Sequence, residues 1–175
     1  MVIKSNTRVF ATKHARRKAL LKRTKKNKDI IFGARSIQAH TGEVFARFTE
    51  DWDILTKNPK KSAVEMEKTF DNIVGFNYFY TKPALHPGTH KVMGRGVDMR
   101  KGTADDEGII DYSKFPSPNP PFKIIDGVRY RTLAQEKKAK LKALRDPEFK
   151  FRHKKDAEDL NRIEASQFKF KKINI

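Results

Sequence analysis

Short apolar runs, separated by glycines and polar residues, predict alternating strands and helices in the first third of the chain. Residues 29–33 predict a buried strand that ends at Gly33, and residues 36–47 predict a short helix with a break at Gly42. Residues 47–55 alternate between apolar and polar positions, which is typical of a strand with one polar face. The pattern therefore predicts a strand, a glycine turn, a helix and a second strand.

A helix should follow this second strand. Ser62 is placed to cap it, and Glu65, three positions later, completes a capping box. The apolar side of this helix is expected in the core, as helical spacing of this kind usually indicates packing. Its members are Ala63, Met66, Phe70 and Ile73.

The remaining pattern changes from strands to helices near Thr132. Strands are predicted at 76–85, 89–97 and 108–116, and a further strand or turn at 122–130. Two helices follow, separated by a break at Asp146–Pro147; the first has Leu133, Leu141 and Leu144 as its apolar positions. The sum is an α+β fold, a small mixed sheet flanked by helices.

Charge divides the chain into three parts. Residues 1–28 contain no acidic residue and form a basic arm or helix, residues 29–165 form the folded domain, and residues 166–175 form a basic tail. The chain has 39 Lys and Arg against 21 Asp and Glu, so its formal net charge is +18. A charge of this size attracts polyanions, which makes RNA or DNA the expected partner. The alternative is a basic structural component of a ribosome or virion.

Composition excludes several classes of chemistry. The chain has no cysteine, so disulfides, thiolate catalysis and cysteine zinc sites are excluded. The five histidines show no spacing typical of zinc ligands, and Ser36 with His40 lacks the acidic residue of a catalytic triad. No apolar run reaches the roughly 18 residues of a membrane span, so no membrane partner is expected. The absence of cysteine fits a cytoplasmic protein, and association with a virion is the alternative location.

Two aspartates flank the single tryptophan of the strand at 47–55. Asp51 and Asp53 share one strand face while Trp52 lies on the other, so both carboxylates can reach one site. Two carboxylates this close repel unless a cation lies between them, and Mg²⁺ is the usual cation of an all-oxygen site that also binds phosphates. Because two-metal phosphoryl chemistry usually needs a third carboxylate, we expect Asp111 to supply it, with Asp98 as the alternative.

A lone D-x-D is more often a turn or a cap, and here its neighbours favour the metal site. Gly33 ends a strand and precedes a helix, and the D-W-D motif begins 18 residues later. This order resembles the polymerase-beta-type nucleotidyltransferase superfamily. The resemblance implies that the turn cradles a nucleoside triphosphate and that Asp51, Asp53 and Asp111 hold two Mg²⁺ ions. A helix N-terminus suits phosphate for independent physical reasons.

The C-terminal part extends the resemblance to small nucleotidyltransferases typified by AbiEii abortive-infection toxins. The D-G-V strand near 126–128 precedes a lysine-bearing helix, and K-D-A-E-D-L follows at 155–160. The resemblance covers roughly residues 29–163 and implies that Lys140 and Lys155 neutralise phosphate charge. It also implies a bacterial or phage-infected cell as the setting, with a toxin–antitoxin, repair or virion role left open.

The glycine turn departs from the family pattern. The family usually has Gly-Gly or Gly-Ser where this chain has Gly33 and Ala34, so a hydroxyl for the phosphate would come from Ser36. Arg35 could compensate, since a guanidinium suits phosphate geometry. We therefore expect a metal-dependent transfer of a nucleoside monophosphate to an acceptor hydroxyl, on nucleic acid such as tRNA. The alternative is an inactive nucleotidyltransferase fold that serves as a nucleic-acid-binding structural or virion component.

Overall fold

A computed structural model describes residues 3–42, 49 and 51–173. It contains five α-helices, one 3-10 helix and seven strands among these residues. In chain order they are α1 (Ile3–Asn27), β1 (Ile30–Phe32), α2 (Ala34–Thr41), β2 (Trp52–Thr56), α3 (Pro59–Val74), β3 (Phe79–Pro83), β4 (Thr89–Gly94), β5 (Glu107–Lys114), β6 (Phe122–Ile125), β7 (Val128–Arg131), α4 (Leu133–Arg145), η2 (Pro147–Arg152) and α5 (His153–Ile173).

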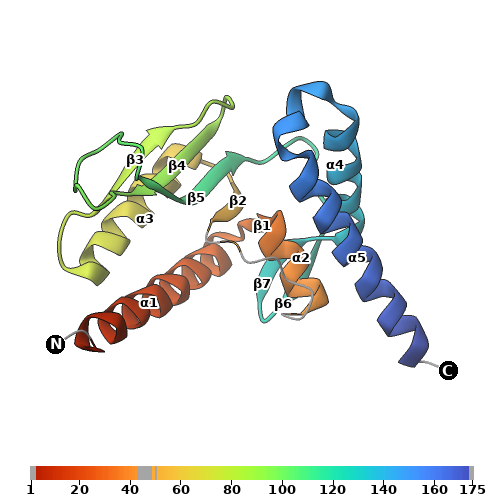
Figure 1. Cartoon of the computed structure of the whole chain (residues 1–175), viewed down its shortest axis with the longest axis horizontal. Helices are drawn as coiled ribbons and strands as arrows, with labels where there is room; N and C mark the ends of the chain where they lie inside the picture. Colours follow the sequence, from red (N-terminus) through yellow and green to blue (C-terminus); the bar gives the residue numbers. More distant parts are fainter. Residues whose placement is uncertain (1–2, 43–48, 50, 174–175) are drawn as a thin grey trace.

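The strands form one mixed sheet in the order β3-β4-β5-β2-β1-β7-β6. At its centre β1 is antiparallel to β2 and parallel to β7, while β2 is parallel to β5. The outer pairs β3–β4, β4–β5 and β6–β7 are antiparallel. Helices flank this sheet, with α1 and α3 at one side of the molecule and α2, α4 and α5 at the other (Figure 1). The α+β prediction is confirmed.

One layer of the core lies between the sheet and helices α1 and α3. Trp52 and Ile54 of β2 pack there with Leu20 of α1 and with Met66 and Phe70 of α3. Strand alternation sends the residue between them, Asp53, to the opposite face. The sequence pattern predicted this division of β2 into an apolar and a polar face.

The strands and most helices lie where the pattern predicted them, with one wrong cap. Asn58, and not Ser62, caps α3: the Asn58 side chain accepts a hydrogen bond from the Lys61 amide, and Pro59 occupies the first turn. An Asn-Pro pair starts a helix because proline needs no amide partner there. Ser62 is instead a buried residue in the first turns of α3, and its hydroxyl lies 3.0 Å from the Thr56 hydroxyl.

The apolar markers predicted for α4 do not define its buried face. Leu141 is 37% exposed, whereas Glu136 and Lys140 are buried. Both charged side chains can be buried because each has partners. Glu136 contacts the Gly33 amide and the Arg131 guanidinium, and Lys140 pairs with Asp156 and Asp159. The polar side of α4 therefore faces the interior.

The two basic ends of the chain are helical within the described residues. Helix α1 contributes Leu20 and Thr24 to the interior, and α5 continues past residue 166 as far as Ile173. Of the helix predicted at 36–47, residues 36–41 belong to α2, which has Gly42 as its C-cap. Residues 43–47 of that prediction, and Phe48 of the strand predicted at 47–55, lie outside the described residues. No helix of the described residues is long and apolar enough to cross a membrane.

Candidate active site

The turn between β1 and α2 has a conformation that only glycine adopts readily. Gly33 has φ +70° and ψ −149°, and a Cβ atom built on it would lie 2.4 Å from Oδ2 of Asp53. Its amide donates a hydrogen bond to Oε1 of Glu136 at 2.9 Å. Glycine is therefore required here both for the backbone and for the approach of Asp53.

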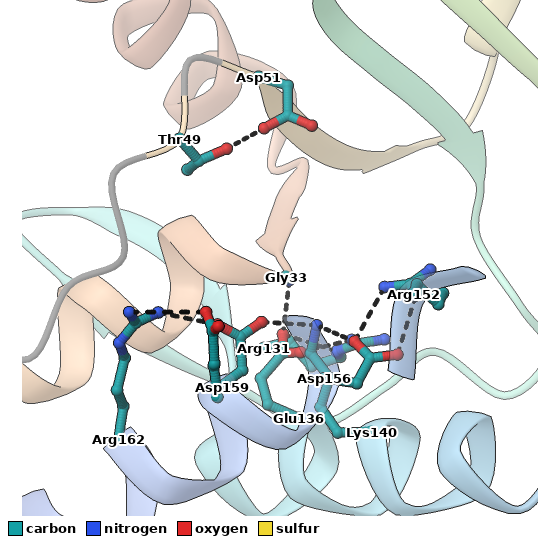
Figure 2. Close-up of polar contacts among 11 residues, drawn as sticks. Gly33, Thr49, Asp51, Arg131, Glu136, Lys140, Arg152, Asp156, Asp159 and Arg162 are labelled. Carbon is teal, nitrogen blue, oxygen red and sulfur yellow. Dashed lines mark hydrogen bonds and ion pairs between the residues drawn. The ribbon is translucent and has the colours of Figure 1, made fainter. Parts of the chain in front are cut away.

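The pairing of β2 with β5 brings two of the predicted aspartates together. Asp53 and Asp111 are register partners in these parallel strands, and Phe32 of β1 pairs with Asp53 from the other side. Asp51 lies just before β2, is exposed and accepts a hydrogen bond from the Thr49 hydroxyl (Figure 2). The three aspartates lie on one cavity of about 610 Å³, together with Gly33 and Ala34.

The cavity has mixed charge. Its first wall carries the aspartates of β2 and β5. Its second wall, from α4, η2 and α5, carries most of the cations together with two further carboxylates, Glu136 and Asp156. The cationic lining residues are Arg131, Lys140, Lys142, Arg152 and Lys155. Such a site has one side suited to cations and another suited to phosphates.

Asp53 is the carboxylate most strongly affected by its surroundings. Burial, together with the negative charges of Asp51, Asp111 and Glu136, raises the pKa of Asp53 to about 7, against the lowering effect of Lys140. A raised pKa shows that negative charge at Asp53 is not fully compensated by the protein itself. A divalent cation at this position would supply the compensation.

The donor set suits a hard cation, although the side chains do not converge tightly. Within the described residues, no three His, Cys, Asp or Glu side chains lie close enough together to hold a metal ion. The carboxylate of Asp111 is instead 2.9 Å from Nζ of Lys91. The features that favour a cation here are the raised pKa of Asp53 and the position of Asp51, Asp53 and Asp111 on one cavity.

Asp98, the alternative third carboxylate, lies away from the cavity. It belongs to the loop between β4 and β5, where it accepts hydrogen bonds from the Arg100 amide and the Thr103 hydroxyl. This is the turn role that a lone aspartate often has. Asp111 is thus the residue that the fold places beside Asp53.

The structure places Arg35 and Ser36 away from the phosphate role expected of them. Ser36 is buried, and its hydroxyl donates a 2.6 Å hydrogen bond to the carbonyl of Arg131. The guanidinium of Arg35 lies 4.6 Å from the centre of the Trp52 ring and donates to the Thr49 carbonyl. Neither side chain lines the cavity that Gly33 and Ala34 line.

The two predicted lysines differ in surroundings. Lys140 is buried and forms ion pairs of 2.8 Å with both Asp156 and Asp159 (Figure 2). Lys155 is exposed at the rim of the cavity. Burial alone would raise the pKa of Asp156, yet Lys140 and Arg152 hold it below its usual value. Lys140 therefore fixes α4 to α5, and Lys155 keeps its charge available to the cavity.

Two residues important for the site were missed from the sequence, Glu136 and Arg131. Glu136 is fully buried and accepts hydrogen bonds from the Gly33 amide and, at 2.9 and 2.6 Å, from the Arg131 guanidinium. It lies 103 residues from Gly33 in the chain, so no local pattern connects them. The available signal was a glutamate at helical spacing, four residues before Lys140.

Replacing Asp53 with asparagine should stabilise the metal-free protein at about pH 8. The folded-state pKa of about 7 lies above the usual 3.8, so the wild type loses stability as pH rises through this interval. The shift sets an upper bound of about 4 kcal/mol. We expect Asp53→Asn to melt at least about 3 °C above wild type in a chelator.

This difference should shrink as the pH falls from about 7 toward 4, where both proteins carry a neutral group at this position. Other buried acids, such as Asp29, titrate in both proteins and cancel in the comparison. Equal melting temperatures at about pH 8 would show that Asp53 is not destabilised by its neighbours. Thermal melts across the pH range measure both quantities.

Replacing Lys140 with methionine should destabilise the fold by about 2–3 kcal/mol, because two buried carboxylates would each lose a partner. Arg152 and Arg162 retain contacts with Asp156 and Asp159, which keeps the loss below that of a wholly unpaired charge. Urea unfolding of the full chain measures it. The exposed Lys142→Met on the same helix is the control and should change stability by less than about 0.5 kcal/mol.

Comparison with solved structures shows a nucleotidyltransferase-type fold. The crystal structure of the Megavirus polyadenylate synthase matches 94% of this chain with a TM-score of 0.66 and 13% identity. The structure of JHP933 from Helicobacter pylori matches 84% of it with a TM-score of 0.53 and 16% identity. The chain spans 35% of the length of the first and 62% of the second. No protein-family model and no curated protein matches the sequence.

Proposed function

We propose that the protein is a metal-dependent nucleotidyltransferase that moves a nucleoside monophosphate from a nucleoside triphosphate to an acceptor hydroxyl. The observation that carries this proposal is the cavity in which Gly33, Asp51, Asp53 and Asp111 lie together within a nucleotidyltransferase-type fold. The resemblance between the sequence and the superfamily supports it independently. The AbiEii-like subfamily rests on the order of the C-terminal motifs alone.

Asp51, Asp53 and Asp111 would hold two Mg²⁺ ions. Bound Mg²⁺ would neutralise charge on the phosphates and lower the cost of the developing negative charge. Helix α2 begins at Ala34, which lines the cavity, so the positive end of the helix suits the triphosphate. Lys155, at the rim, would contribute positive charge from the opposite wall.

The reaction balances with the groups of this cavity. The acceptor hydroxyl oxygen attacks the α-phosphorus, the bond from that phosphorus to the β-bridging oxygen breaks, and pyrophosphate leaves. Asp111 would accept the hydroxyl proton, because its carboxylate is partly exposed beside Asp53. This role requires Asp111 to exchange its contact with Lys91 for the acceptor.

A nucleic acid is the proposed acceptor. The net charge of +18 favours a polyanion over a small neutral molecule. The matched Megavirus protein is a polyadenylate synthase. An RNA 3′ hydroxyl, such as that of tRNA, is therefore the first acceptor to test.

Transfer of label from each α-³²P nucleoside triphosphate onto total RNA and protein tests the proposal. Wild type with Mg²⁺ should produce a labelled band, and Asp51→Ala/Asp53→Ala should produce none. The band identifies both the nucleotide and the acceptor class. Absence of label with wild type over all four nucleotides and both acceptor classes would contradict the proposed reaction.

A second function, nucleic-acid binding without catalysis, is favoured by one feature of the cavity. Asp111 is paired with Lys91, and the acidic side chains of the described residues do not converge on one point. A protein of this kind would be a structural or virion component. It would bind RNA equally well after removal of Asp51 and Asp53, and no label would transfer.

A further inference from the structure

A second cavity, of about 450 Å³, lies at the other end of the central strands. We call it the basic cavity and define it by six of its lining residues. These are Lys28, Lys57, Lys114, Phe115, Phe122 and Arg129. Among the residues that the structure describes, none lines both this cavity and the candidate active site.

The topology explains why these cations meet. Lys28 lies before β1, Lys57 follows β2, Lys114 ends β5, and Arg129 pairs with Ile30 at the start of β1. These positions are at the ends of the central strands that lie away from Gly33. Lys57 comes four positions after Asp53 in the chain, which corresponds to roughly 13 Å along an extended strand.

The charge of the basic cavity is of one sign. All four of its charged lining residues are cations, and no carboxylate lines it within the described part of the chain. The active-site cavity, by contrast, contains both signs. Lysines on a surface are commonly just solvated, so the charge alone identifies no ligand.

The aromatic residues distinguish this cavity from an ordinary basic surface. Phe122 is 39% exposed and lines the cavity, and the Arg129 guanidinium lies 4.5 Å from its ring centre. Arg129 also donates a hydrogen bond of 3.4 Å to the carbonyl of Lys28. An aromatic ring and four cations therefore line the same cavity.

We propose that the basic cavity binds single-stranded nucleic acid, with the lysines at the phosphates and Phe122 stacked on a base. Exposed rings beside cations are the usual features of single-strand sites, because every base has a face that stacks. An acidic peptide would use the cations and leave the ring without a flat partner. The volume lies within the roughly 300–1,000 Å³ of ligand sites.

This binding goes beyond the proposed transfer and does not depend on it. Nucleic acid bound in the basic cavity would lie roughly 13 Å or more from Asp53. The nucleotides bound there would therefore not be those at the reacting end. The site would therefore increase affinity for long single strands over short ones. It would do so in an inactive protein as well.

Fluorescence anisotropy of a labelled RNA of about ten nucleotides, titrated with the full chain, tests the proposal. No divalent cation or triphosphate is added. Lys57→Gln/Lys114→Gln should weaken binding about tenfold at about 100 mM salt, and should reduce the log–log salt slope by about 1.4. Phe122→Ala should weaken binding about tenfold with the slope unchanged, and Phe122→Tyr should restore it.

The matched control is Lys68→Gln/Lys138→Gln, which removes the same charge from exposed positions outside both cavities. It should change the dissociation constant by no more than about twofold. An equal loss with the control, or no loss with Phe122→Ala, would overturn the proposal. So would competition by poly-glutamate as strong as competition by unlabelled RNA of the same charge.

Asp53→Asn separates this proposal from the proposed transfer. It should bind the RNA as tightly as wild type while transferring no label. Loss of transfer with retained binding supports both proposals. Retained binding in a wild type that transfers nothing would contradict the transferase and leave the nucleic-acid site supported.

Discussion

Asp53→Asn should reduce nucleotidyl transfer by at least about a thousandfold, equivalent to about 4 kcal/mol of transition-state stabilisation. Asparagine keeps the size and shape of the side chain but removes the negative charge. Asp53 lies between Gly33 and Asp111 in the cavity, where the fold concentrates negative charge. Single-turnover rates of label transfer at saturating triphosphate measure the effect.

The control for this prediction is Asp98→Asn, which makes the same chemical change at an aspartate of the β4–β5 loop. Its transfer rate should stay within about threefold of the wild-type rate, since surface positions away from a site rarely have larger effects. If both variants lost activity equally, general damage would explain the loss. If Asp53→Asn kept its activity, Asp53 would have no part in the reaction.

The combination of lost activity and gained stability makes the prediction specific. Removing a destabilised carboxylate should raise the melting temperature of the metal-free protein at about pH 8 while transfer is lost. If Asp53 had a purely structural role, its replacement would lower both the transfer activity and the melting temperature. A functional site that concentrates like charges reduces the stability of the free protein.

Much of this site follows from local patterns. The apolar run at β1, the glycine that ends it and the alternation across Trp52 together predicted which face of β2 carries Asp53. The third aspartate could be proposed because Asp111 is the one charged residue in the apolar middle of β5, residues 109–112. These features extend over a few residues, so side-chain periodicity defines them.

The rest depends on pairings between distant segments. The Gly33 amide meets Glu136, and the α4 helix buries Lys140 against α5, through contacts that no local pattern encodes. The leucines of α4 predicted the wrong buried face. A charged side chain is buried only where a partner lies beside it, and the local sequence of α4 does not reveal that partner. The partners, Asp156 and Asp159, lie beyond a helix break.

Gly33→Ala should lower transfer at least about a hundredfold and should destabilise the fold by about 2–3 kcal/mol. The alanine Cβ would lie 2.4 Å from Oδ2 of Asp53, so the carboxylate must turn away from its position. The backbone at φ +70° and ψ −149° adds strain, because residues with a Cβ rarely adopt it. Urea unfolding and label transfer measure the two effects.

Gly42→Ala separates the strain from the contact. Gly42 has φ +82° and ψ 171°, a similarly restricted backbone, and a Cβ there meets nothing within 4 Å among the described residues. It should therefore lose about 1–3 kcal/mol of stability and keep its transfer activity. If both variants lost activity equally, backbone strain, and not the contact with Asp53, would explain the loss in Gly33→Ala.

A double-mutant cycle between positions 33 and 53 measures the contact itself. In an Asp53→Ala background the carboxylate oxygen is absent, so Gly33→Ala should cost less stability than in wild type, by about 1 kcal/mol. If the stability cost of Gly33→Ala were the same in both backgrounds, the Asp53 side chain would turn away from the alanine without loss of stability. The loss of transfer activity would then measure only the displacement of the carboxylate. Coupling would show that the glycine and the carboxylate form one unit, in which the lack of a side chain on the turn allows the acid to reach the cavity.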